Sequence, residues 1–120
     1  LEGYQKAIDW MLENKKSTIL NFGPHTSEYR TVAQVAQDYI EISGKGSIEI
    51  LHEEMFSEAE FLLLDSTKAR STLNWTEKLS LKKSLSWTHE WYSARNENRK
   101  ALDISMNQIK RFESTDNVND

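Results

Sequence analysis

Residues 61–75 place the tightest local constraint on the fold. A short apolar run ends at Asp65, whose carboxylate can accept hydrogen bonds from the free amides of a helix that begins at Ser66. Asn74 lies where that helix must stop, and Asn tolerates the left-handed backbone conformation that commonly ends a helix. We therefore expect a strand-like run, a sharp corner, a short helix and then Trp75, folded back as an apolar anchor.

Four other segments have the apolar spacing of amphipathic helices. They are residues 4–12, 32–40, 81–92 and 101–112. Thr31 or Arg30 can begin the second of these helices, Gly44 can end it, and Ser80 can cap the third. In the last segment the aligned apolar residues are Leu102, Met106 and Ile109.

Between the helices the sequence predicts short strands. Residues 17–22 are apolar and partly β-branched and are closed by Gly23-Pro24, whereas residues 48–50 alternate between apolar and acidic. With the apolar run before Asp65, these segments predict a mixed α/β fold that is rich in helix. We expect one lobe over residues 1–113, an acidic surface loop at residues 52–60, and a polar, disordered tail at residues 114–120.

Composition narrows the classes of function. A chain of 120 residues with 38% hydrophobic residues suits one small domain with a modest core. No apolar run approaches the roughly 20 residues that cross a bilayer, and the chain does not begin with a basic and then apolar leader. Together with the absence of cysteine, this predicts a soluble, cytoplasmic protein. A net charge of −4 argues against a nucleic-acid partner.

The residues that nicotinamide chemistry requires are missing. A dinucleotide cofactor needs a glycine-rich turn against its pyrophosphate, but the four glycines are scattered. A short-chain dehydrogenase also needs Tyr-x-x-x-Lys, in which the lysine lowers the pKa of the tyrosine, and none of the four tyrosines has Lys four residues on. We therefore predict no catalytic and no cofactor-binding residue in this chain.

The sequence also has no motif that indicates a metal site or a hydrolase site. The histidines His25, His52 and His89 lie far apart, and the acidic residues near His52 lack the spacing of a calcium loop. No Gly-x-Ser-x-Gly context accompanies the serines. We predict no metal site, and we interpret the four tryptophans as core and anchor residues.

Several motifs resemble the C-terminal part of extended short-chain dehydrogenase/reductases that act on nucleotide sugars. They are Leu1-x-Gly3-Tyr4, Asn21-Phe22-Gly23-Pro24 before Thr31-Val32, and Asp65-x-x-Lys68-Ala69 with Leu73-Asn74-Trp75, where the family usually has Gly in place of Asn. The distal motifs resemble the CDP-glucose 4,6-dehydratases in particular. These are Thr88-His89-Glu90-Trp91-Tyr92-Ser93-Ala94 and Gln108-Ile109-x-x-Phe112-Glu113.

The resemblance implies a substrate-binding lobe without its Rossmann core. In this family a tightly held NAD oxidises the sugar at C4, water is lost across C5 and C6, and the hydride returns to give a 4-keto-6-deoxy sugar. Ser57-Glu58-Ala59 stands where the family has His-Glu-Ala, so Glu58 is either a ribose or sugar hydroxyl contact or a surface-loop acid. The whole enzyme, which binds CDP-glucose, is expected to be a homo-oligomer, and this chain alone to be inactive, to bind no NAD and to self-associate.

Two alternatives stay open. The same lobe could belong to another nucleotide-sugar dehydratase or epimerase, because Ser57 replaces the family's His and Leu63 stands where Lys is common. The chain could also be a free-standing interaction module whose aromatic helices, residues 81–95 and 101–112, dock a partner.

Overall fold

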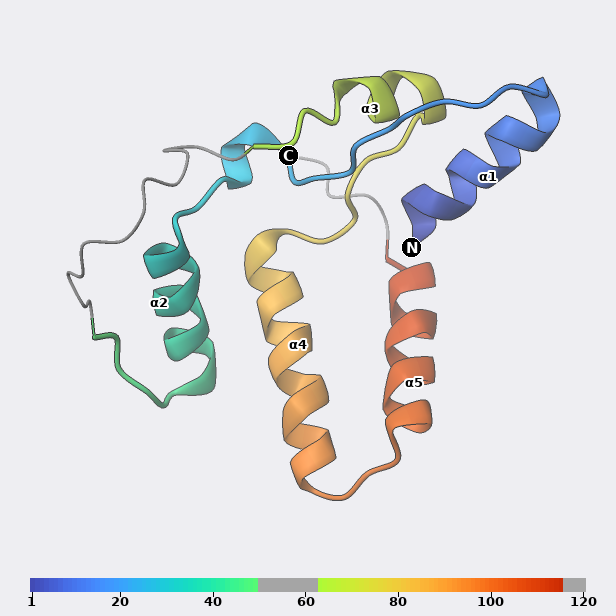
Figure 1. Cartoon of the computed structure of the whole chain (residues 1–120). Helices are drawn as coiled ribbons and strands as arrows, with labels where there is room; N and C mark the ends of the chain where they lie inside the picture. Colours follow the sequence, from blue (N-terminus) through green and yellow to red (C-terminus); the bar gives the residue numbers. More distant parts are fainter. Residues whose placement is uncertain (50–62, 116–120) are drawn as a thin grey trace. The chain divides into compact units, whose positions relative to one another are not determined.

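The computed structural model describes residues 1–49 and 63–115, and the regular structure in these residues is entirely helical. The elements are α1 (Glu2–Asn14), the short 3-10 helix η1 (Thr26–Glu28), α2 (Val32–Ser43), α3 (Thr67–Leu73), α4 (Leu81–Asn96) and α5 (Ala101–Glu113) (Figure 1). No helix among them is both long enough and apolar enough to cross a membrane. The described residues divide into two compact units, which are residues 1–27 with 63–77 and residues 28–49 with 78–115.

The helix-rich part of the predicted fold is confirmed, and its strands are not. Residues 17–22 have no strand, nor do residues 48–49 and 63–64, whereas residues 50, 61 and 62 lie outside the described residues. A strand needs a neighbour to satisfy its alternate amides and carbonyls. Within the described parts of the chain no second segment pairs with residues 17–22. The α/β prediction therefore reduces to a helical arrangement here.

In the first unit, α1 packs on α3 through small residues. Gly3 and Ala7 lie one turn apart on α1 and are both buried, and Ala69 of α3 is fully enclosed. The Lys6 ammonium of α1 donates to the Asn74 carbonyl, 3.3 Å away, just beyond the end of α3. A carbonyl at a helix end has no partner within the helix, so this bond both caps α3 and joins it to α1.

The helices of the second unit have well-formed ends. Thr31 and Gln34 form a reciprocal capping box at the start of α2, and Gly44 ends the helix with a left-handed φ of 65°. Ser80 accepts a hydrogen bond from the Lys83 amide at the start of α4, as the sequence predicts. The Glu28 carboxylate adds a second acceptor, 3.0 Å from the Leu81 amide, where the helix dipole favours negative charge.

The core of the second unit lies along α4. This helix packs against both α2 and α5, and its Trp87 is only 6% exposed. On α5 the residue that faces the core is Ile104, at 5% exposed. The aligned residues Leu102, Met106 and Ile109 instead lie on the exposed side of α5. The sequence pattern located the helix but not the face that α4 covers.

Candidate functional site

The predicted corner at residues 65–75 forms as a capped helix. The Thr67 amide donates to Oδ1 of Asp65 over 2.9 Å, and α3 begins at Thr67, one residue later than expected. Hydrogen bonds from the side chain and the amide of Thr67 hold the pKa of Asp65 below its usual value. Asn74 ends the helix in the left-handed conformation, with a φ of 46°. The cap and the stop are both confirmed.

The ring of Phe22 joins three of the motifs. Its centroid lies 5.4 Å from that of Tyr4 and 5.1 Å from that of Trp75, both in edge-to-face geometry. Gly3 lets the helix approach this ring, because a Cβ at that position would lie 2.5 Å from Cε1 of Phe22. Trp75 thus acts as the expected anchor, although it stays partly exposed. These contacts bring residues 3–4, 21–24 and 65–75 together.

A polar cluster completes this corner. Arg70 forms a bidentate pair with Glu77, in which Nη2 lies 2.7 Å from Oε1 and Nη1 contacts Oε2. Nη2 of Arg70 also donates to the Gly23 carbonyl over 3.3 Å, and so does the buried Ser66 hydroxyl. These hydrogen bonds from Arg70 lower the pKa of Glu77. The guanidinium also lies 5.2 Å from the centroid of Trp75, so one arginine joins Gly23, Trp75 and Glu77.

In the second unit the distal motifs are partners across α4 and α5. The Trp91 indole nitrogen donates to the Ser105 hydroxyl over 3.1 Å, and the Gln108 amide donates to the Trp87 carbonyl over 2.8 Å. Arg111 forms an ion pair with Glu90 at 2.7 Å. The residues that carry the closing motifs therefore hold the two helices together.

A polar chain links α2 to α4. His89 lies between the Tyr39 hydroxyl, 3.4 Å from Nδ1, and the Ser93 hydroxyl, 3.3 Å from Nε2. These contacts are long for hydrogen bonds between side chains. Ser93 lies one turn after His89 within α4, and not on the strand-to-helix turn of a Gly-x-Ser-x-Gly hydrolase. The arrangement joins two helices and gives no support for hydrolysis.

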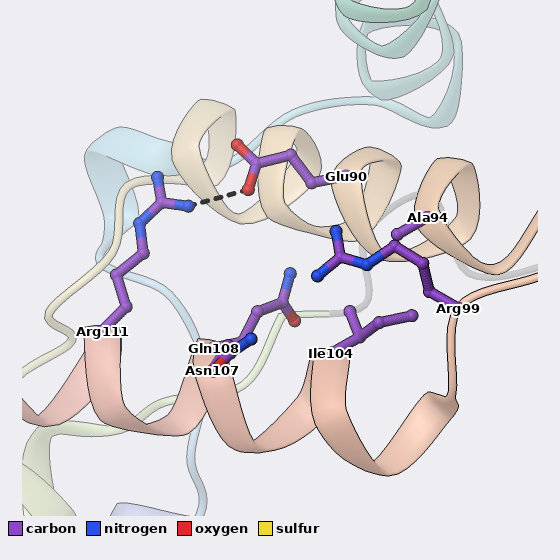
Figure 2. A pocket seen from close by; sticks show the side chains of 7 residues that line it. All are labelled: Glu90, Ala94, Arg99, Ile104, Asn107, Gln108 and Arg111. Carbon is purple, nitrogen blue, oxygen red and sulfur yellow. Dashed lines mark hydrogen bonds and ion pairs between the residues drawn. The ribbon is translucent and has the colours of Figure 1, made fainter. Parts of the chain in front are cut away.

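A cavity of about 140 Å³ lies between α4 and α5. Its floor is formed by Ala94 and Ile104, which are both buried. Its rim is polar, and Figure 2 shows that the side chain of Arg99 extends from the turn between the helices toward the middle of the cavity. The other rim residues are Glu90, Asn107, Gln108 and Arg111.

The predicted substrate contact cannot be placed in this geometry, because Glu58 lies outside the described residues. The four glycines lie at separate places in the structure: Gly3 packs on Phe22, Gly23 lies against Leu64, and the other two follow the end of α2. They therefore form no glycine-rich turn before a helix. Within residues 1–49 and 63–115, no group of three His, Cys, Asp or Glu side chains could hold a metal ion.

Sequence reasoning missed the polar residues of both units. Arg70, Glu77 and Arg99 belong to no recognised motif, and their partners lie on other segments. Only the left-handed residue Asn98, an amino acid that tolerates this conformation, could have indicated how the turn before Arg99 is built.

Comparisons with protein-family models, with curated proteins and with solved structures found no match to this chain.

Proposed function

We propose that this chain is the C-terminal, nucleotide-sugar-binding lobe of an NAD-dependent CDP-glucose 4,6-dehydratase. One observation carries the proposal: the segments that resemble this family contact one another within each unit. Phe22 lies against Tyr4 and Trp75 in the first unit, and in the second Glu90 of one distal motif pairs with Arg111, which lies within the closing motif. Residues kept together by a shared architecture behave in this way, whereas chance motif matches have no reason to meet.

The proposal divides the chemistry between two parts of a longer enzyme. The cofactor and the acid and base groups lie in the Rossmann part, and this lobe contributes binding contacts to CDP-glucose. Glu58 is the proposed contact to a ribose or sugar hydroxyl. We expect this lobe to have the mixed, helix-rich α/β fold in that context, and the whole enzyme to be a cytoplasmic homo-oligomer.

A chimera tests the proposal without the chain's own upstream sequence. The chain replaces the C-terminal lobe of a characterised CDP-glucose 4,6-dehydratase, and mass spectrometry follows the loss of one water from CDP-glucose. We expect the chimera to form product and the chain alone to form none. The matched control is the same chimera with Glu58→Gln, for which we expect a higher KM. A chimera that folds and binds NAD but gives no product from any nucleotide sugar would contradict the proposal.

A second candidate is a helical interaction module. It is favoured by the exposed row Leu102, Met106 and Ile109 on α5, since such rows commonly mark contact surfaces. The two candidates differ in what this row does. In a module, Met106→Glu abolishes binding to the partner, whereas in the dehydratase chimera the same change leaves the affinity for CDP-glucose unaltered and affects only assembly.

A further inference from the structure

The cavity between α4 and α5 combines a net positive charge with a small volume that is partly open to solvent. Two arginines and one glutamate line it, so its rim carries a net charge of +1. Its volume of about 140 Å³ is well above the roughly 10–15 Å³ that one water needs. We propose that this cavity binds a phosphate-type oxyanion. The proposal does not rest on the dehydratase assignment.

Arg99 is the central element of this site, because its backbone is fixed and its side chain is available. Asn98 takes the left-handed conformation with a φ of 62°, and the amides of Asn98 and Arg99 bond back to the carbonyls of Arg95 and Ala94. This pair of bonds is a Schellman ending, which rigidifies the turn. The Arg95 guanidinium also donates to the Arg99 carbonyl. In the described part of the chain, the Arg99 guanidinium has no partner of its own.

Arg111 offers a second guanidinium that is already oriented. It stacks over the buried Trp87 ring, 4.1 Å from the centroid, and bonds to Glu90. Both members of this ion pair are about half exposed, at 50% and 47%. Ion pairs of this kind contribute little stability, so an incoming oxyanion can replace Glu90 as the acceptor. The stacking on Trp87 keeps the guanidinium in place when that happens.

The neutral groups of the rim suit the same ligand. The Asn107 amide lines the cavity and has no partner among the residues that the structure describes, so it can donate to an anion. The Gln108 amide is already bonded to the Trp87 carbonyl, which fixes its position beside Arg99 (Figure 2). Planar guanidinium groups and amide donors around a tetrahedral anion are a common mode of phosphate recognition.

An NMR titration of the 120-residue chain with inorganic phosphate tests this inference. Ionic strength is held constant with chloride, and the signals followed are the Arg99 and Arg111 side-chain NH groups and the Asn107 amide. We expect saturable shifts at these three residues. A parallel titration with CMP separates a free ion from a phosphate ester: saturation with either ligand supports the site, and saturation with neither overturns it.

Three variants make the test more specific: one should weaken phosphate binding, one should strengthen it, and one is a control that should leave it nearly unchanged. Arg99→Gln should weaken phosphate binding at least about tenfold, because it removes the charged donor. Glu90→Gln should strengthen binding about two- to fivefold, because it removes the competing carboxylate. Lys82→Gln changes the net charge as Arg99→Gln does but lies away from the cavity, and should stay within about twofold. Equal losses in the Arg99 and Lys82 variants, or weaker binding in the Glu90 variant, would contradict the site.

Discussion

The two units hold themselves together in different ways. In the first, contacts come from coil segments and helix ends that converge on the Phe22 ring and on Arg70. In the second, whole helices lie along one another, with capped ends and a buried tryptophan between them. The first unit therefore depends on exact fit at a few atoms, whereas the second depends on the volume of its core. Mutations should separate these two kinds of stability.

Removal of Trp87 should have the largest effect. This side chain is 6% exposed, and Trp87→Ala deletes an indole from the centre of the second unit. We expect a loss of about 3–5 kcal/mol in the free energy of unfolding, measured by urea denaturation with amide signals of α4 as the probe. Leu102→Ala, on the exposed side of α5, is the control and should change this free energy by less than about 0.5 kcal/mol. Similar losses in both would show that Trp87 is not the core.

A methyl group at Gly3 should disturb the first unit alone. The new Cβ would lie 2.5 Å from a Phe22 ring that Tyr4 and Trp75 already confine. Such overpacking costs about 1–3 kcal/mol, visible in the urea unfolding of α1 and α3. The double variant Gly3→Ala/Phe22→Leu should lose less stability than the sum of the losses of the two single variants, because the smaller side chain at position 22 leaves room for the new methyl group. Additive losses would argue against contact between the two residues.

The ion pair of the first unit should give a pH-dependent effect. Because Arg70 lowers the folded-state pKa of Glu77, the ionised carboxylate stabilises the unit above the pKa of the unfolded chain. That contribution is lost as the pH falls through the lower folded-state pKa. Glu77→Gln should therefore cost about 1–2 kcal/mol at pH 7 and much less near pH 3. Urea unfolding of the wild type and the variant at both pH values measures the difference, and a gap that is independent of pH would refute the pairing.

Replacement of the helix stop should have the smallest effect. Asn74 has a φ of 46°, where glycine fits without strain, so Asn74→Gly should change the free energy of unfolding by less than about 0.5 kcal/mol. Asn74→Ala places an ordinary side chain in the same conformation and should cost about 1–2 kcal/mol. Thermal melts of the two variants would show the contrast. Equal melting temperatures would mean that the left-handed stop is unimportant.

The sequence predicted what depends on near neighbours. The caps at Thr31 and Ser80 and the stops at Gly44 and Asn74 are set within a few residues, and each forms as expected. Within residues 1–49 and 63–115 no predicted strand is present, because pairing depends on a second segment that local pattern cannot supply. The buried face of α5 depends on where α4 lies, and so does the cavity around Arg99. The Arg70–Glu77 pair depends on how the chain turns after the end of α3, which no local pattern specifies.

Nucleotide preference in the dehydratase chimera tests the central claim most directly. The chimera is assayed with CDP-, UDP-, GDP- and dTDP-glucose at equal concentrations, and kcat/KM for loss of water is compared. A lobe from a CDP-glucose 4,6-dehydratase predicts the highest value for CDP-glucose, by at least about tenfold. A higher value for any of the other three would contradict the assignment to this family, even if the chimera proved fully active.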